Sequence, residues 1–402
     1  MKLQHKWMFK ARLRFSAFNW KASNLACRRL KEAVAEIKKV SKIEPVTAGD
    51  GAVALLERIW PVFQDVDGSS GALGGMVAWA QEEVLPIIIA APADRKTRDA
   101  WMERLWRAIE EDGVEYLSET GDRWGELCAS PQVAAAWADR FVDSLRASWT
   151  APRFTGYFQT TSVCLSSLLA AGRHHELMEM LALPRLPFWH DRKFGVQALL
   201  SQGRVDEAIA YADASRGLNQ PDIVIDFVCE KILLDHDRED EAYEKYALSA
   251  NQSSTGVASF LAIRKKYPDR NPRMILSDLA SRSGDPGRWF AAAKDAEHLD
   301  LALEFACTGR TDPRTLSRAS RDMLNKDAQF SLEIGRLALR RIVEGYGYEL
   351  TDSDVLAACK HFLAAANELG VAAKARAELL AMAAENPTTF SDLLVAQATP
   401  EP

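Results

Sequence analysis

The sequence predicts an all-α protein, an α-solenoid of antiparallel helix pairs, and three observations support this prediction. Apolar residues recur at three- and four-residue steps through most of the chain, strand-like alternation is nearly absent, and one short turn motif repeats at spacings of 31 and 34 residues. The chain has 402 residues, 48% of them apolar and 26% charged, which is ordinary for a folded protein. That length allows two or three globular units or one repeat array.

Residues 22–40 show the helical period first. Their apolar side chains form one stripe, with charged side chains off it, which is typical of an amphipathic helix with one buried face. The stripe consists of Ala26, Leu30, Ala33, Ile37 and Val40. Similar stripes follow within residues 53–63, 76–84, 101–109 and 133–145. The β-branched runs 87–89 and 223–225 lie inside longer patterns of the same period, so we expect them to be helical too.

The helix starts carry recognisable capping signals. Ser130, Asn271, Asp285 and Asp312 each stand directly before a proline, which places a capping side chain ahead of a proline at the first helical position. Residues 351–354 resemble a capping box, because an acid follows the capping threonine after three residues. Helices that start this often predict antiparallel pairs joined by short loops.

The internal repeat is a turn motif between two helices. It occurs at Gly172–Leu177, Gly203–Ala208 and Asp237–Ala242, aligned without gaps, and a weaker copy of the following helix lies at Leu301–Ala306. Each of the three turns follows a Leu-rich helix and opens another. In an array of this kind each helix pair packs on the next, and the stacked pairs bury a continuous core.

This combination of a helix, a tight Gly-Arg turn, an acid and a small residue opening the next helix resembles the tetratricopeptide repeat family. The resemblance covers roughly residues 157–306 and is loose, because the aromatic positions of the family's first helix are not regular here. The whole chain also resembles a group of uncharacterised bacterial proteins that share stretches such as Gly287–Lys294 and Gly345–Glu349. These resemblances imply a helical-repeat fold and bring no activity with them.

Tryptophan is distributed unevenly, since nine of the eleven precede residue 150. We therefore expect a boundary near Ala151-Pro152 between two kinds of helical packing. The predicted regions are a basic segment with the first helix at 1–42, a Trp-rich, HEAT-like part at 43–150, tetratricopeptide-like repeats at 151–386 and a tail at 387–402. Such a boundary can be a change of repeat type within one continuous array.

Charge is also uneven along the chain. Residues 1–42 hold twelve Lys or Arg against Glu32 and Glu36, a net of +10, while the whole chain carries −6, so the other 360 residues carry −16. Aromatic residues interleave with these cations, a mixture that suits nucleic acid or a membrane surface. The candidate contact residues are Lys6, Trp7, Lys10, Arg12, Arg14, Trp20, Lys21, Arg28 and Arg29. The alternatives are an organelle presequence and, favoured here, a first capping helix that packs on the array.

The cysteines and the apolar runs indicate a cytoplasmic protein. The six cysteines are at least 36 residues apart, no C-x-x-C is present, and most have apolar neighbours, as buried reduced cysteines do. Residues 154–172 carry too many hydroxyl and amide side chains to insert in a bilayer as a single helix, so we predict no membrane span.

Few motifs in the sequence indicate a catalytic, metal-binding or ligand-binding site. The glycine-rich run 68–75 lacks the Lys-Ser/Thr ending of a phosphate loop, and no third ligand is spaced to join His174 and His175 on a metal. No nucleophile elbow occurs either. The densest cluster is Trp189, His190, Asp191 and Arg192, a candidate ligand site for which packing and helix capping are the favoured interpretation. We expect no metal and no cofactor.

These features favour a non-enzymatic scaffold or adaptor that binds another protein, as a peptide or helix, on a solenoid face. The first alternative is a nucleic-acid-binding helical-repeat protein that uses the basic N-terminus. The second alternative is a hydrolase or transferase with a site near His190.

Overall fold

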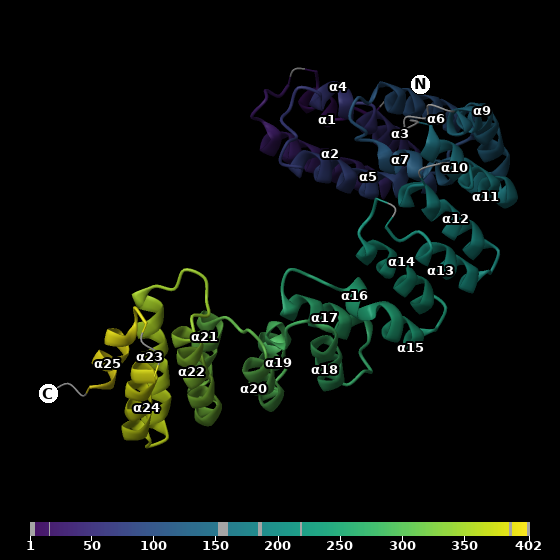
Figure 1. Cartoon of the computed structure of the whole chain (residues 1–402). Helices are drawn as coiled ribbons and strands as arrows, with labels where there is room; N and C mark the ends of the chain where they lie inside the picture. The colour runs from purple at the N-terminus through teal and green to yellow at the C-terminus, as the bar shows by residue number, and fades with distance from the viewer. Residues whose placement is uncertain are drawn as a thin grey trace. The chain divides into compact units, whose positions relative to one another are not determined.

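The computed structural model describes residues 5–15, 17–151, 160–183, 187–217, 219–385 and 388–399, and every regular element within these ranges is a helix (Figure 1). The prediction of an all-α protein is therefore confirmed. The chain divides into two compact units, unit 1 at Met1–Pro221 and unit 2 at Asp222–Pro402.

The N-terminal helices of unit 1 pack around one hydrophobic core. The helix α2 packs against both α3 and α5, and α9 packs against α10. One hydrophobic cluster of buried residues extends from Trp7 to Ala198 and continues across the region near residue 151 where the composition changes. The helices of this unit are α1 (Phe9–Arg12), α2 (Ser23–Ser41), α3 (Pro45–Leu56), α4 (Ile59–Phe63), α5 (Ala72–Ala90), α6 (Arg95–Glu111), α7 (Ser118–Asp122), α8 (Trp124–Leu127), α9 (Pro131–Thr150), α10 (Thr161–Ala170), α11 (His174–Leu181), α12 (Trp189–Ser201) and α13 (Val205–Asp213).

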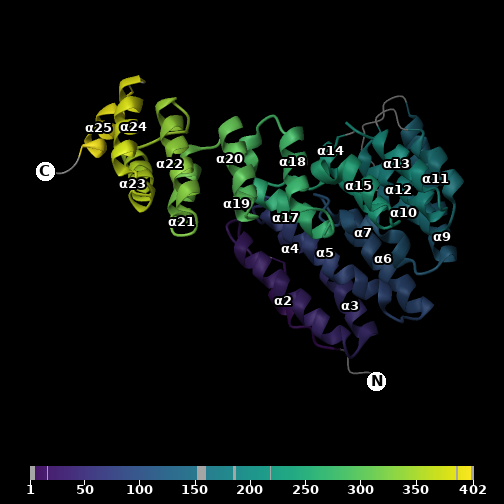
Figure 2. The same ribbon diagram turned by 90° about the horizontal axis from the view of Figure 1, so that it is seen from below.

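Unit 2 continues with helices that pack mainly on their neighbours in sequence (Figure 2). The pairs α21–α22 and α22–α23 are in close contact, and α21 also touches α23 directly. The elements are α14 (Asp222–Leu234), α15 (Glu239–Ala242), the π-helical η1 (Tyr243–Ala247), α16 (Leu248–Ala250), α17 (Gly256–Lys266), α18 (Pro272–Arg282), the 3₁₀ turn η2 (Pro286–Trp289), α19 (Phe290–Asp295), α20 (Leu299–Thr308), α21 (Pro313–Met323), α22 (Ala328–Val343), α23 (Asp352–Glu368), α24 (Ala372–Glu385) and α25 (Ser391–Ala398).

The local signals read from the sequence are found where they were expected. Both β-branched runs are helical, one in α5 and the other in α14. The side chains of Ser130, Asn271, Asp285 and Asp312 each accept a hydrogen bond from a backbone N–H of the following helix. The capping box is present as well, because the Asp354 carboxylate accepts the Thr351 N–H at 2.9 Å. These caps satisfy helix donors that would otherwise have no partner.

The repeated turn has one geometry in all three predicted copies. Gly172, Gly203 and Asp237 have positive φ angles of 71°, 72° and 57°. After each, the N–H of the next residue reaches back to the carbonyl five residues earlier, as in Arg204 N to Leu199 O at 3.0 Å. This is the Schellman arrangement, which closes the end of one helix while the next begins. The arginine then pairs with a glutamate three residues on in each copy, at Glu176, Glu207 and Glu241.

In unit 2 the same turn leads directly from one helix into another at two more places. Glu297 has a φ of 64°, and the His298 N–H reaches Ala293 O at 3.0 Å, directly before the helix that holds the weaker sequence copy. Gly370 has a φ of 70°, and the Val371 N–H reaches Ala366 O at 2.8 Å. The second of these has little sequence likeness to the repeat, so only the backbone shows it.

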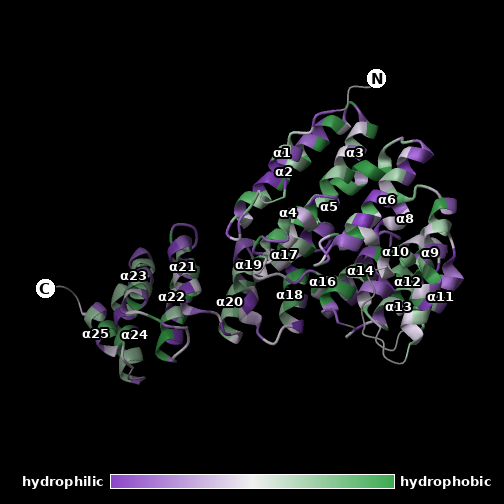
Figure 3. Ribbon diagram, turned by 90° about the horizontal axis from the view of Figure 1, so that it is seen from above, coloured by the Kyte–Doolittle hydropathy of each residue, from purple (hydrophilic) through white to green (hydrophobic). Residues whose placement is uncertain are grey.

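One helix among the described residues, α5, is long and apolar enough to cross a membrane. In the structure it packs against α2 and α3 and buries Leu73, Val77 and Leu85 among other residues, which is the behaviour of a core helix. Figure 3 shows α3 and α5 as largely hydrophobic, whereas α2 alternates between hydrophilic and hydrophobic residues. The cytoplasmic location of the protein remains a prediction.

We expect Gly203→Ala to lower the free energy of unfolding by roughly 1–2 kcal/mol, because a Cβ atom is strained in the left-handed region. No atom lies within 4 Å of the added Cβ, so the cost is purely conformational. The control is Gly75→Ala within α5, which also meets nothing and should stabilise by about 0.5–1 kcal/mol. Urea unfolding measures both, and equal stability of the two variants would contradict the role given to this turn.

Candidate functional site

The basic N-terminal segment, residues 5–42, divides its aromatic side chains between the core and the surface. Trp7, Phe9 and Phe18 are buried in the core of unit 1. The Trp7 ring lies against Gly51, where a Cβ atom would come within 2.1 Å of it, so this glycine makes room for the ring. Among the predicted contact residues, Trp7 is thus the buried one, with 5% exposure.

Two acids of α2 hold the preceding part of the segment against this helix. The Glu36 carboxylate accepts the backbone N–H groups of Met8 at 2.7 Å and Phe9 at 3.1 Å, which holds α1 beside α2. Glu32 pairs with both Arg12 and Arg29 at 2.7 Å. Two of the predicted contact residues, Arg12 and Arg29, are therefore engaged in ion pairs within the unit.

The other predicted contact residues lie at the surface of unit 1. No ion pair joins any of these cations to an acid within the part of the chain that the structure describes. Trp20 is 62% exposed and Lys10 is half-buried. The exposed members of the set are Lys6, Arg14, Trp20, Lys21 and Arg28.

The second predicted site forms a polar cluster in which three helices of unit 1 meet. His190 in α12 lies 3.0 Å from the Ser162 hydroxyl of α10 and 3.1 Å from the Asp122 carboxylate of α7, measured from its Nε2 atom. Lys193 forms an ion pair with Asp122 and approaches the other ring nitrogen of His190 at 3.5 Å. The fold thus brings a hydroxyl, an imidazole and a carboxylate together from distant parts of the sequence.

The hydrogen-bond connectivity of this cluster differs from that of a catalytic triad. A triad histidine takes the nucleophile's proton on one ring nitrogen while the acid holds the other. Here Ser162 and Asp122 share the Nε2 side of His190, and the Nδ1 side faces the cation of Lys193. Because the hydroxyl and the carboxylate both contact the same ring nitrogen, the acid cannot orient the imidazole toward the serine.

The other two predicted residues of this site have packing roles. Trp189 is buried at the start of α12. The Arg192 guanidinium lies over the Tyr211 ring of α13, 4.3 Å from its centroid, a cation–π contact within the helix pair. Trp189 and Arg192 therefore contribute to the packing of α12 and α13.

Two carboxyl groups in this cluster have opposite pKa shifts. Burial alone would raise the pKa of Asp122, but the hydrogen bond from His190 and the charge of Lys193 lower it below its ordinary value. Burial raises the pKa of Asp191 to about 6, only partly offset by the charges of His190 and Lys193. Asp122 is thus stabilised as a carboxylate, whereas Asp191 is held in surroundings that disfavour its charge.

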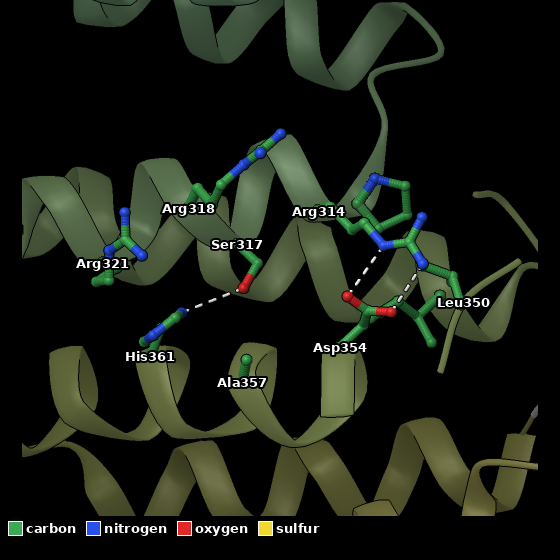
Figure 4. A pocket seen from close by; sticks show the side chains of 10 residues that line it. Arg314, Ser317, Arg318, Arg321, Leu350, Asp354, Ala357 and His361 are labelled. Atoms are coloured by element: carbon green, nitrogen blue, oxygen red, sulfur yellow. Dashed lines mark hydrogen bonds and ion pairs between the residues drawn. The ribbon is translucent and has the colours of Figure 1, made fainter. Parts of the chain in front are cut away.

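A third candidate site, in unit 2, was not predicted from the sequence. It is a cavity of about 190 Å³ between α21 and α23 (Figure 4). From α21 it is lined by Arg314, Ser317, Arg318 and Arg321, and from α23 by Asp354, Ala357 and His361, with Leu350 at one end. Apart from the adjacent Ser317 and Arg318, these lining residues of each helix are three, four or seven residues apart and so share one face. We call this cavity the arginine groove.

Arg314 closes one end of the arginine groove. Its guanidinium forms two hydrogen bonds with the Asp354 carboxylate, at 2.9 and 2.8 Å, and also donates to the carbonyl oxygens of Tyr348 and Glu349. The bidentate geometry fixes α21 to α23. The same contact holds the pKa of Asp354 well below its usual range. Arg314 is therefore structural and has little capacity left for a ligand.

Arg318 and Arg321 are less constrained. Arg318 donates to the Thr315 hydroxyl at 3.2 Å and has no acidic partner among the described residues. Within the described ranges Arg321 pairs only with the neighbouring Asp322, and both side chains are more than half exposed. A pair this exposed contributes little and exchanges readily. Two cations on one turn of α21 are thus available to an anionic group.

His361 faces these arginines across the groove. One of its ring nitrogens lies 3.2 Å from the Ser317 hydroxyl. Burial lowers the pKa of His361, and the charges of Arg321 and Lys360 lower it further. At neutral pH the imidazole is therefore uncharged and can exchange a hydrogen bond with Ser317. The repeat of arginines at 314, 318 and 321 was the sequence signal that could have pointed to this face.

The described residues contain no group of three or more His, Cys, Asp or Glu side chains that could hold a metal ion. Comparison with protein-family models finds no match for this chain, and comparison with the curated proteins finds none either. The chemistry of these sites is therefore inferred from their own side chains.

We expect Asp191→Asn to stabilise the protein at pH 7, by at most about 3 kcal/mol, because one pKa unit corresponds to about 1.4 kcal/mol. The folded pKa of about 6 lies above the ordinary 3.8, so the folded state binds more protons between these values and wild-type stability falls as the pH rises through them. Asp191→Asn should lack this decrease in stability between pH 4 and pH 7, which urea unfolding at the two pH values measures.

The matched control is Asp269→Asn, at an exposed aspartate, which should leave stability unchanged at both pH values. If Asp191→Asn destabilised the protein equally at both pH values, the Asp191 side chain would be stabilising the fold. That result would contradict the expectation that its charge is unfavourable.

Proposed function

We propose that this chain is a helical-repeat interaction protein, an α-solenoid that binds a segment of another protein. Five turns that close one helix and lead directly into the next, three of them at the spacing of the sequence repeat, support stacked helix pairs. In unit 2, α21 and α23 are the first helices of successive pairs and touch each other directly, while α22 touches α24. First helices that lie side by side are the basis of a continuous binding face in such an array.

The observation that carries this proposal is the arginine groove between these two first helices. Its volume of about 190 Å³ is below the ~300–1,000 Å³ of pockets that hold drug-sized molecules. The groove accommodates one or two side chains of a peptide rather than a cofactor. Its lining combines apolar Ile342 and Leu350 with the cations, as a site for a mixed polar and apolar segment requires.

The charges of the groove favour an acidic segment. Asp354, the acid that lines it, is already paired with Arg314, so Arg318 and Arg321 dominate the charge presented to a ligand. Carboxylates bind arginine with charge-assisted hydrogen bonds, which contribute about 1.5–3 kcal/mol each. The proposed ligand is therefore a peptide segment with acidic residues next to apolar ones.

We expect Arg318→Gln/Arg321→Gln to weaken binding of a fluorescein-labelled peptide of alternating Glu and Leu by at least about tenfold, from the loss of two charge-assisted hydrogen bonds. Fluorescence anisotropy with the full chain measures the dissociation constant. Arg107→Gln/Arg264→Gln removes two exposed arginines elsewhere and should change it little. Equal loss in both double variants would mean that only net charge matters, and no binding by the wild type would refute the proposal.

We also expect the affinity for this peptide to rise as the pH falls from 8 to 6, by up to about tenfold per pH unit, the limit for one proton. An anion bound beside Arg321 offsets the charge that disfavours His361 protonation, so binding raises the pKa of His361 and takes up a proton. His361→Gln should bind with a constant affinity over this range. A pH dependence that survives in this variant would assign the proton to another group.

A further inference from the structure

The N-terminal part of unit 1 presents more positive charge than its acids neutralise. Its two acids are occupied, Glu32 by Arg12 and Arg29, and Glu36 by the backbone of α1. Lys38 pairs with Glu83 of α5. The other cations of residues 5–42 have no ion pair within the described chain; they are Lys6, Lys10, Arg14, Lys21, Arg28, Lys31, Lys39 and Lys42.

Half of these cations form a row along the outer side of α2. Arg28, Lys31, Lys39 and Lys42 are all exposed, and their spacing of three, eight and three residues keeps them within about 80° of one another around the helix axis. The opposite side of α2 holds the buried residues of its apolar stripe. At 1.5 Å per residue the row is roughly 21 Å long.

Exposed apolar side chains precede and follow this row in the sequence. Phe15 is 65% and Trp20 is 62% exposed just before α2, and each is adjacent to a cation, Arg14 and Lys21. Ile43 is 80% exposed just after α2. The segment buries Trp7, Phe9 and Phe18 in the core, so exposure of Phe15 and Trp20 is not a general property of its aromatic residues.

We propose that this surface, the α2 cation row with Phe15, Trp20 and Ile43, docks on an anionic lipid bilayer. Lysine and arginine are attracted to anionic headgroups, while Trp and Phe favour the interface between headgroups and acyl chains. The outward apolar set includes the aliphatic Ile43, which cannot stack on a base as an aromatic ring can. Apolar side chains that precede and follow a straight row of cations match a flat lipid surface better than a nucleic-acid strand.

The test is cosedimentation of the full chain with vesicles of phosphatidylcholine, with and without phosphatidylserine. Each cation near an anionic surface contributes about 1 kcal/mol, or roughly fivefold in affinity, so Arg28→Gln/Lys31→Gln should bind the anionic vesicles about 25-fold more weakly. Binding should weaken with added salt and be lost on neutral vesicles. Trp20→Ser should reduce binding at low and at high salt alike.

The matched control is Arg264→Gln/Lys265→Gln, which removes two exposed cations from α17 and should bind anionic vesicles as the wild type does. Equal weakening in both double variants would overturn the assignment to α2. Failure of the wild type to bind anionic vesicles would overturn the proposal. It would be overturned equally if the protein bound single-stranded DNA, with the salt dependence of phosphate contacts, and did not bind the vesicles. None of these outcomes bears on the arginine groove, which is tested with a peptide.

Discussion

The carbonyl groups at the end of each helix must find donors, and this constraint shapes the chain from α10 onward. At the five such turns that lead directly into another helix, a residue in the left-handed region lets its own N–H and that of the next residue reach back into the finished helix. The next helix then begins almost at once, so the two helices return alongside each other. Glycine or aspartate at the first three turns suits this, because both tolerate a positive φ better than most residues do.

Arginine satisfies helix ends where no such turn is present. The buried Arg98 in α6 donates to the carbonyls of Ile88 and Ala91 at the end of α5 and to Leu127 of α8. In unit 2 the guanidinium of Arg341 donates to the carbonyls of Cys307 and Gly309 at the end of α20. A cation at a helix C-terminus also interacts favourably with the helix dipole. The same residue type thus joins helices from different pairs and, at Arg314, shapes the arginine groove.

Much of this fold could be predicted from local sequence, because helical periodicity, capping residues and the repeated turn are short-range signals. The sites could be predicted only in part. His190 was singled out, but its contact with Asp122 joins residues 68 apart and depends on how α7 and α12 each pack on α10. The arginines of α21 were visible as a pattern, whereas the helix that faces them was not. The burial of Trp7 and the exposure of Trp20 likewise depend on residues outside the N-terminal segment, such as Gly51, which contacts the Trp7 ring.

The stacking of helix pairs into a solenoid is the central proposal, and small-angle X-ray scattering of the full chain in solution tests it most directly. A compact globule of 402 residues has a radius of gyration of about 21 Å. A solenoid predicts a clearly larger radius and a distance distribution with a long tail. A radius near 21 Å with a symmetric distribution would show instead that the helix pairs collapse on one another, and would contradict the proposed array.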